Sequence, residues 1–125
     1  MSGVKILVVD DVTSMRNVTK SILMVADYTN VTLASDGAKA LELLNTEPYD
    51  LIICDWEMPN MSGLEVLIEI RKNEKLKDIP FLMLTANTEK IKVDVAIKAG
   101  ATDYVIKPIQ ASALIEKINN CLSKK

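Results

Sequence analysis

Short apolar runs alternate along the chain with longer segments in which apolar residues recur every third or fourth position. The apolar runs have the length of strands and span 4–9, 30–34, 51–54, 81–84 and 104–106. The helical spacing is set by Met15, Val18, Ile22 and Val25; by Ala38, Leu41 and Leu44; by Leu64, Leu67 and Ile68; by Ile91, Val95 and Ala99; and by Leu114, Ile115, Ile118 and Leu122. The pattern predicts five strands and five helices in strict alternation.

Strict alternation is typical of an α/β domain in which right-handed crossovers build a parallel sheet with helices on both faces. The nearly continuous apolar strands agree, because parallel strands are buried on both sides. The chain has 125 residues, 49% of them hydrophobic and 26% charged, and no linker or internal repeat divides it. We therefore expect a single domain over residues 1–125. The alternation alone leaves the strand order open.

Composition excludes several classes of function. The net charge of −2 gives no electrostatic footprint for nucleic acid or for a membrane surface. No apolar run approaches twenty residues and no secretory leader is visible, so we expect a cytoplasmic protein whose cysteines, Cys54 and Cys121, are unpaired. Histidine is absent, which excludes Ser/His and Cys/His nucleophilic pairs and the commonest zinc ligand.

Polar residues follow four of the strand candidates at the point where each strand ends. Asp10 and Asp11 follow the first, Asp55 the third, Thr85 the fourth and Lys107 the fifth. In a parallel sheet these ends lie side by side, so three carboxylates, a hydroxyl and an ammonium would meet at one edge. Taken singly, each residue is more simply a helix cap, a turn residue, a strand residue or a solvated charge.

The set taken together points to metal-assisted phosphoryl chemistry. Converging carboxylates cannot all stay ionised without a cation, because like charges raise one another's pKa. Mg²⁺ suits such a site, since it takes oxygen ligands and often joins carboxylates to phosphate. An aspartate beside Mg²⁺ can attack phosphorus to give an acyl phosphate. A hydroxyl and an ammonium are suitable partners for the equatorial oxygens of the transferred group.

These residues, in this order, resemble the receiver domain of bacterial two-component response regulators. The resemblance runs from Val4 to about Leu122, and its motifs are Asp10-Asp11, Asp55, Thr85-Ala86, Lys107-Pro108, the loop 55–63 (DWEMPNMSG) and the segment 99–104 (AGATDY). The segment 14–16 and the lack of an output domain are most similar to the CheY-like stand-alone chemotaxis regulators. The resemblance implies a flavodoxin-like, doubly wound (βα)5 fold with strand order 2-1-3-4-5 and ligands beyond the first and third strands.

The resemblance also implies a chemical role for each matching residue. Asp55 is expected to accept a phosphoryl group from the phosphohistidine of a CheA-like histidine kinase. Asp11, Asp55 and the backbone carbonyl of Glu57 are expected to bind Mg²⁺, or Mn²⁺ in its place, with Asp10 acting through water. No other cofactor is implied. Lys107 is expected to contact the phosphoryl group.

The remaining implied roles concern signal output. The Ala86 N–H assists at the phosphoryl group, and Thr85 hydrogen-bonds that group and moves on activation. Tyr104 then turns inward as the aromatic switch, and the Lys107–Pro108 peptide bond is expected to be cis. The expected output face comprises the fourth helix, the fifth strand and the fifth helix, which would bind a protein such as the flagellar switch. The resemblance predicts a monomeric signalling protein, not an enzyme, that a phosphatase can reset.

Some positions depart from the family or stay open. Glu57 and Asn87 exchange the amide and acid of the best-known relatives, which predicts an altered lifetime of the phosphorylated state. Val93 and Ile97 fit a partner-facing strip and a core position equally well, and Trp56 is expected to be half-exposed.

Three alternative functions fit the sequence less well than a receiver does. A haloacid-dehalogenase-like phosphatase needs an acid pair spaced DxD, whereas this chain has Asp10-Asp11-Val12. In a flavodoxin-like cofactor binder, adjacent aspartates after the first strand would repel a phosphate. A degenerate receiver is disfavoured, because every expected site residue is present. A receiver excised from a larger regulator remains open.

Overall fold

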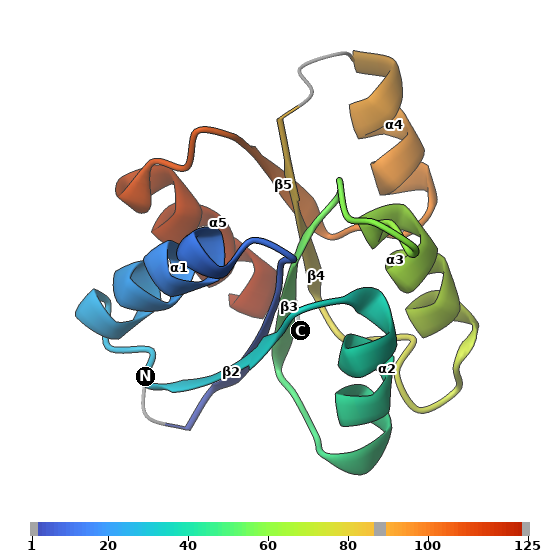
Figure 1. Ribbon diagram of the computed structural model, residues 1–125, viewed down its shortest axis with the longest axis horizontal. Coiled ribbons are helices and arrows are strands. Elements are labelled where there is room, and N and C mark those ends of the chain that lie inside the picture. Colours follow the sequence, from blue (N-terminus) through green and yellow to red (C-terminus); the bar gives the residue numbers. More distant parts are fainter. Residues whose placement is uncertain (1–2, 87–89, 124–125) are drawn as a thin grey trace.

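The computed structural model describes residues 3–86 and 90–123, and within them strands and helices alternate as the pattern predicts. In chain order the elements are β1 (Lys5–Val9), α1 (Thr13–Val25), β2 (Asn30–Ala34), α2 (Gly37–Thr46), β3 (Leu51–Asp55), α3 (Gly63–Lys72), β4 (Phe81–Thr85), α4 (Lys90–Lys98), β5 (Asp103–Ile106) and α5 (Ala111–Ser123). The five strands form one parallel sheet in the order β2-β1-β3-β4-β5, which confirms the order implied by the resemblance. Helices α1 and α5 cover one face, and α2, α3 and α4 cover the other (Figure 1).

The strand register brings the carboxyl ends of the strands to one edge of the sheet. Val9, the last residue of β1, pairs with Cys54 of β3, and Asp55 pairs with Leu84 of β4. Thr85, the last residue of β4, pairs with Ile106 of β5. The residues that end or follow these strands therefore meet at the same edge, as the sequence pattern predicts.

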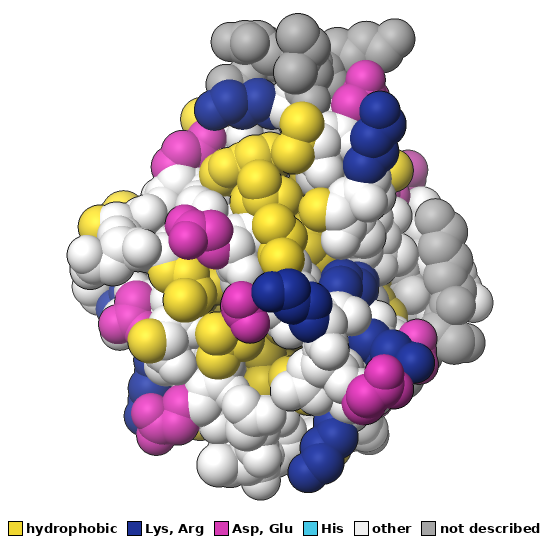
Figure 2. Space-filling view, turned by 90° about the vertical axis from the view of Figure 1, so that its right-hand side faces the viewer, with side chains coloured by type: hydrophobic (Ala, Val, Ile, Leu, Met, Phe, Trp, Pro, Cys, Tyr) yellow, Lys and Arg dark blue, Asp and Glu magenta, His cyan; other side chains and the backbone are white. Residues whose placement is uncertain are grey.

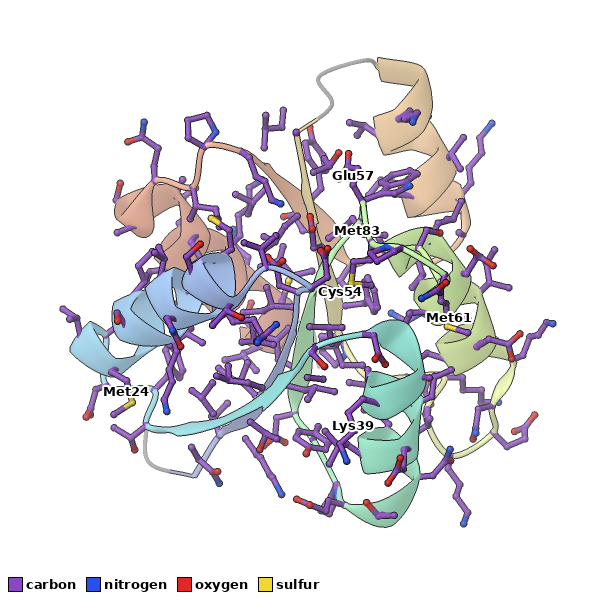
Figure 3. The ribbon with its side chains drawn as sticks, viewed as in Figure 1. Met24, Lys39, Cys54, Glu57, Met61 and Met83 are labelled. Atoms are coloured by element: carbon purple, nitrogen blue, oxygen red, sulfur yellow. The ribbon has the colours of Figure 1, made fainter. Side chains whose placement is uncertain are left out.

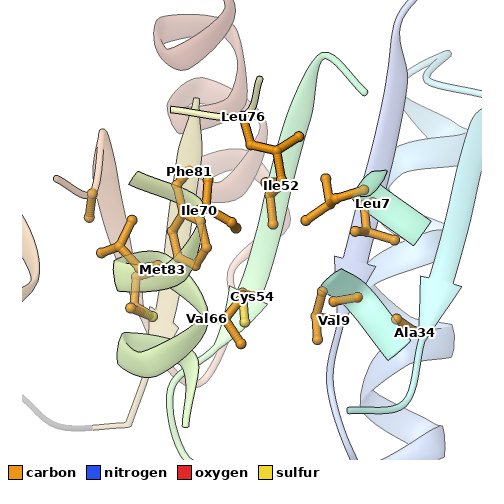
Figure 4. Close-up of a cluster of buried hydrophobic side chains, with 14 of the residues drawn as sticks. Leu7, Val9, Ala34, Ile52, Cys54, Val66, Ile70, Leu76, Phe81 and Met83 are labelled. Carbon is orange, nitrogen blue, oxygen red and sulfur yellow. The ribbon is translucent and has the colours of Figure 1, made fainter. Parts of the chain in front are cut away.

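Two hydrophobic cores lie on opposite faces of the sheet, because successive side chains of a strand point to opposite sides. Toward α2, α3 and α4, Leu7, Ile52 and Phe81 pack with Val66 and Ile70 of α3 (Figure 4). The other core, toward α1 and α5, is formed by Ile6, Val8, Leu23, Tyr28, Leu51, Ile53, Leu82, Leu84, Val105, Leu114, Ile118 and Cys121. The central strands β1, β3 and β4 are thus buried on both faces, as their nearly continuous apolar sequence indicated, while the edge strands β2 and β5 are only partly buried.

Helix α1 is confirmed, but the residues that predicted it do not form its buried face. Its buried residues are Thr19 and Leu23. Val18 is 46% exposed and Val25 is 90% exposed. The apolar residues that predicted the helix therefore lie partly in solvent. A groove of about 700 Å³ runs beside them, between α1 and α5.

The turn from β3 into α3 is unusually tight. Gly63 starts α3 and its N–H donates to the carbonyl of Trp56, 2.9 Å away. A Cβ atom at Gly63 would lie 2.3 Å from the Asp55 carbonyl oxygen, so this position has no room for a side chain. A capping box between Ser62 and Glu65 satisfies free N–H groups at the start of the helix. This turn holds the residues that follow Asp55 over the end of the sheet.

Arg71 connects α3 to the carboxyl end of α4. Its Nε donates to the carbonyl of Gly100 at 3.0 Å, and its Nη1 donates to the carbonyls of Lys77 at 3.0 Å and Ile79 at 2.6 Å. Gly100 has a φ of +109°, a conformation that favours glycine. Burial lowers the pKa of the Arg71 guanidinium, while the charge of Asp78 opposes this shift.

The face formed by α3 and α4 carries a band of hydrophobic side chains (Figure 2). Exposed apolar residues on these helices include Ile68, Val95 and Ile97. Among the α4 side chains that the structure describes, Ala96 is buried and Val93 is partly buried. Ile97 is therefore exposed, as a partner-facing residue would be, whereas Val93 is partly buried. Among the described residues, no helix is long and apolar enough to cross a membrane.

Candidate functional site

Three aspartates converge at the carboxyl edge of the sheet. Asp10 follows β1, and Asp55 is the last residue of β3; they are 1% and 2% exposed. Asp11 is the most exposed of the three. Carboxylate oxygens of all three residues lie within 4.8 Å of one another. The structure therefore brings together the acids that the sequence placed at this edge.

The oxygens of this cluster fit a hard divalent cation. The Oδ1 atom of Asp10 accepts a hydrogen bond from the Val12 N–H at 2.9 Å. Within the described part of the chain, Asp10 Oδ2 and Asp11 Oδ1 are buried atoms without a hydrogen-bond partner. Buried carboxylate oxygens without partners are costly, and Mg²⁺ takes oxygen ligands of this kind. The residues thus suit the metal that the sequence predicted.

Lys107 pairs with Asp55 beside the cluster. Its Nζ lies 2.6 Å from Asp55 Oδ1, and its backbone N–H donates to the carbonyl of Thr85 at 2.8 Å. The peptide bond between Lys107 and Pro108 is cis. Burial raises the pKa of the Asp55 carboxyl; the hydrogen bond and charge of Lys107 lower it without cancelling the rise, and the charges of Asp10 and Glu57 raise it further. The ammonium group of Lys107 therefore does not neutralise all the negative charge around Asp55.

Thr85 and Glu57 meet near Asp55, whose pKa the charge of Glu57 raises. Thr85 is 1% exposed, and its hydroxyl donates to Glu57 Oε1 at 3.4 Å. The Glu57 side chain projects above Cys54 and Met83 at the same end of the sheet (Figure 3). The sequence had singled out both residues, but it carried no signal that they touch. Ala86 follows Thr85 and is exposed, while Asn87 lies outside the described residues.

Trp56 lies between the phosphoacceptor candidate and Glu57, and it is more buried than expected. It is 9% exposed, so the expectation of a half-exposed side chain was wrong. Its backbone N–H donates to the backbone carbonyl of Leu84 at 2.9 Å. The Nζ of Lys92 in α4 lies 5.8 Å from the centre of the indole ring. The burial results from the tight turn before Gly63, which folds the loop onto the sheet.

Tyr104 of β5 lies at a second surface, next to α5. It is partly buried, and Lys117 Nζ lies 5.5 Å from the centre of its ring. The same Nζ pairs with Asp103 at 3.2 Å. A cavity of about 270 Å³ is lined by Tyr104, Ile106 and Lys117, among other residues. Tyr104 therefore lies next to α5, on the face that the resemblance implies for signal output.

Comparison with known proteins identifies the family. Residues 6–119 match the model of the response regulator receiver domain. The chain belongs to this family. The receiver domain is 39% identical over 120 residues to the chemotaxis protein CheY of Pseudomonas aeruginosa, an alignment that covers 96% of this chain and 97% of that protein.

Solved receiver domains share the fold. Chemotaxis protein CheY4 of Vibrio cholerae matches with a TM-score of 0.89 and 34% identity over 95% of this chain and 98% of that one. Response regulator TrrA of Thermotoga maritima, solved with Mg²⁺ and BeF, matches with a TM-score of 0.84 and 39% identity over 95% and 99% of the two chains. The receiver fold is therefore shown by sequence and by structure.

Proposed function

We propose that Asp55 of this receiver domain accepts a phosphoryl group from the phosphohistidine of a histidine kinase, in a reaction that requires Mg²⁺. The carrying observation is the cluster of Asp10, Asp11 and Asp55, whose oxygens lie within 4.8 Å of one another beside Lys107. Asp11, Asp55 and the Glu57 carbonyl would hold the ion, with Asp10 acting through water. When bound, Mg²⁺ supplies charge neutralisation between the carboxylates and the phosphoryl oxygens.

Each residue of the site has a task in the transfer. The Asp55 carboxylate attacks phosphorus as the bond from phosphorus to the kinase imidazole breaks, and the imidazole nitrogen leaves with the electron pair. Lys107, already 2.6 Å from Asp55, is close enough to follow the phosphoryl oxygens. The Ala86 N–H and, once it has moved, the Thr85 hydroxyl donate to those oxygens, as hydrogen-bond donors do in phosphoryl transfer.

The output follows from the position of Thr85 relative to Tyr104. Thr85 ends β4, next to β5, which carries Tyr104. Movement of Thr85 toward the phosphoryl group frees space for Tyr104 to turn inward, which changes the face formed by α4, β5 and α5. We propose that this face binds a protein target of the chemotaxis or flagellar-switch type, in keeping with the CheY relative. On this proposal the protein is a cytoplasmic monomeric signalling receiver, not a turnover enzyme.

A direct binding experiment tests the proposal. We expect the Trp56 fluorescence of the protein to change with beryllofluoride only when Mg²⁺ is present, and acetyl phosphate to add one phosphoryl mass. Asp55→Asn should abolish both responses. Asp78→Asn, the same change in the loop before β4, is the matched control and should retain them.

The outcomes distinguish the alternatives. Multiple turnover of phosphate esters would favour a phosphatase of the haloacid-dehalogenase type. Absence of any Mg²⁺-dependent response in the wild type would overturn the receiver mechanism.

A further inference from the structure

The hydrogen bond between Thr85 and Glu57 joins the loop after β3 to the end of β4. The Trp56 N–H donates to the carbonyl of Leu84 at 2.9 Å. These two residues directly precede Glu57 and Thr85, so the backbone ladder sets the distance over which the two side chains meet. The backbone pairing thus brings the two residues close together, and the Glu57 side chain completes the contact, 3.4 Å from Thr85 Oγ1 to Glu57 Oε1.

The two partners differ in how readily they can separate. Thr85 is 1% exposed, whereas Glu57 is an exposed residue. A carboxylate that leaves the contact returns to water at little cost, but a buried hydroxyl needs another acceptor. A donor–acceptor distance of 3.4 Å is long for an O–H···O bond, which makes the contact weak and easily exchanged.

A phosphoryl group on Asp55 would compete for the same proton. A threonine hydroxyl has one hydrogen to donate, so the bond to Glu57 and a bond to a phosphoryl oxygen exclude each other. The phosphoryl group also adds negative charge next to the Glu57 carboxylate, and like charges repel. Phosphorylation would therefore offer Thr85 a stronger acceptor and displace the existing one.

We propose that Glu57 is a positioning residue that latches the Thr85 hydroxyl in the unphosphorylated protein and so sets how readily the switch responds. This inference deepens the proposed function and rests on phosphorylation at Asp55. The form in which Glu57 holds the Thr85 hydroxyl binds a phosphoryl group or its analogue less well. The latch therefore reduces the fraction of protein that is competent to bind the analogue, which lowers its apparent affinity. Breaking the latch while keeping the negative charge should make the switch more sensitive.

Glu57→Asp separates the latch from the charge. The shorter side chain keeps the carboxylate but withdraws it from Thr85. We expect beryllofluoride, titrated with Mg²⁺ at saturation and followed by Trp56 fluorescence, to bind about threefold to tenfold more tightly, as loss of one long hydrogen bond would give. Glu69→Asp makes the same change on the exposed surface of α3 and should leave the affinity unchanged.

The Thr85 background shows whether the effect passes through the hydroxyl. In Thr85→Val, introducing Glu57→Asp should change beryllofluoride affinity by less than about twofold, because no hydroxyl remains to be latched. An unchanged affinity in Glu57→Asp alone, or an equal gain in both backgrounds, would overturn the latch while leaving phosphorylation of Asp55 intact.

A second measurement needs no phosphate analogue. In the metal-free protein, NMR couplings of Thr85 should report one dominant side-chain rotamer in the wild type and rotamer averaging in Glu57→Asp. Identical couplings in the wild type and Glu57→Asp would contradict the latch. This holds even if Thr85→Val no longer binds beryllofluoride. If the wild type lacks any Mg²⁺-dependent response, the proposed function fails and the latch fails with it.

Discussion

At the scale of single residues, the acidic cluster combines affinity for a cation with a cost to the folded protein. Asp10 and Asp55 are almost completely buried, and their oxygens lie within 4.8 Å of each other and of Asp11. Without a cation these charges repel, and only Lys107 pairs with the cluster through Asp55 at 2.6 Å among the contacts of the described residues. Removing one charge should therefore stabilise the metal-free protein.

Asp10→Asn tests this cost. The amide oxygen can still accept from the Val12 N–H, so the turn after β1 is preserved. In buffer with EDTA we expect the free energy of unfolding to rise by about 1–3 kcal/mol, the scale of repulsion between charges at this distance. Saturating Mg²⁺ should shrink the difference, because the wild type gains binding energy that the variant largely lacks. Urea denaturation measures both; a less stable variant in EDTA would contradict the expectation.

The pH dependence of stability carries the signature of Asp55. Its pKa in the folded protein lies above the ordinary value of 3.8, so the folded state binds the proton more tightly than the unfolded state does. Its contribution to stability is fully present below pH 3.8 and is lost as pH rises through the folded pKa. The stability advantage of Asp55→Asn over the metal-free wild type should therefore grow from acid to neutral pH. A difference that stays constant across a pH series of urea melts would count against this assignment.

The exchange of residue types at Glu57 and Asn87 should affect how long the phosphoryl group persists. The two residues follow Asp55 and Thr85 by two positions, and if Asp55 is phosphorylated as proposed, we expect them to influence the water that attacks phosphorus. We expect the double variant Glu57→Asn/Asn87→Glu to dephosphorylate at a different rate from the wild type. Decay of the phosphorylated mass measures the rate, and equal decay would remove the hypothesis.

At the scale of elements, helix starts decide how the site is built. Helices α2 and α3 both begin with glycine, Gly37 and Gly63, but only one of these glycines packs against the backbone of the site. A Cβ at Gly63 would lie 2.3 Å from the Asp55 carbonyl oxygen, and backbone at this point cannot yield without moving the loop. A Cβ at Gly37 would instead meet side-chain atoms of Met61 and Val66 at 2.8 Å.

This contrast predicts unequal effects of the same substitution. Gly63→Ala should lower the free energy of unfolding by about 3 kcal/mol or more and weaken Mg²⁺ binding, because it displaces the loop that carries Glu57. Gly37→Ala should cost less, since the Met61 side chain can shift. Urea midpoints and a Mg²⁺ titration of Trp56 fluorescence provide the comparison. Equal losses of stability and of Mg²⁺ affinity in the two variants would mean that the close contact between Gly63 and the Asp55 carbonyl is no more important than the contacts of Gly37.

The elements also show which features could be predicted from sequence. The places of Asp10, Asp55 and Thr85, at or just after the ends of strands, were readable because apolar runs are local signals and parallel strands align their carboxyl ends. The exposure of Val25 was not readable, since the spacing that reveals a helix does not say which stripe packs inward. The burial of Trp56 depends on the tight turn after β3, which is set by tertiary contacts.

At the scale of the whole molecule, the site residues and the hydrogen bonds of Arg71 lie at opposite ends of the sheet. The acids, Thr85 and Lys107 lie at the carboxyl ends of the strands. The carbonyls that Arg71 binds belong to Lys77 and Ile79, before β4, and to Gly100, before β5. Arg71 thus ties α3 to the carboxyl end of α4, away from the acidic cluster.

Arg71→Lys should weaken this connection. A lysine lacks the planar fork that serves three carbonyls at once, so buried acceptors lose partners. We expect a loss of about 1–3 kcal/mol in the free energy of unfolding, with little change in Mg²⁺ affinity. Lys72→Arg, at the neighbouring exposed position, is the control for urea denaturation. Unaltered stability in Arg71→Lys would show that these hydrogen bonds contribute nothing net.

The hydrogen bond from Arg71 to the Gly100 carbonyl holds the segment that follows α4, and we expect it to limit movement at that end of the helix. A rigid rod fixed at one end pivots about that end. If α4 pivots near Gly100, its displacement grows with distance from Gly100 and is greatest at its amino end, which follows Thr85 in the chain. Helix α4 would then act as a lever, converting a small shift of one hydroxyl into a larger swing. Amide hydrogen exchange with and without beryllofluoride should show a graded change along α4, smallest near Ala99; a uniform change would indicate that the helix moves as a whole.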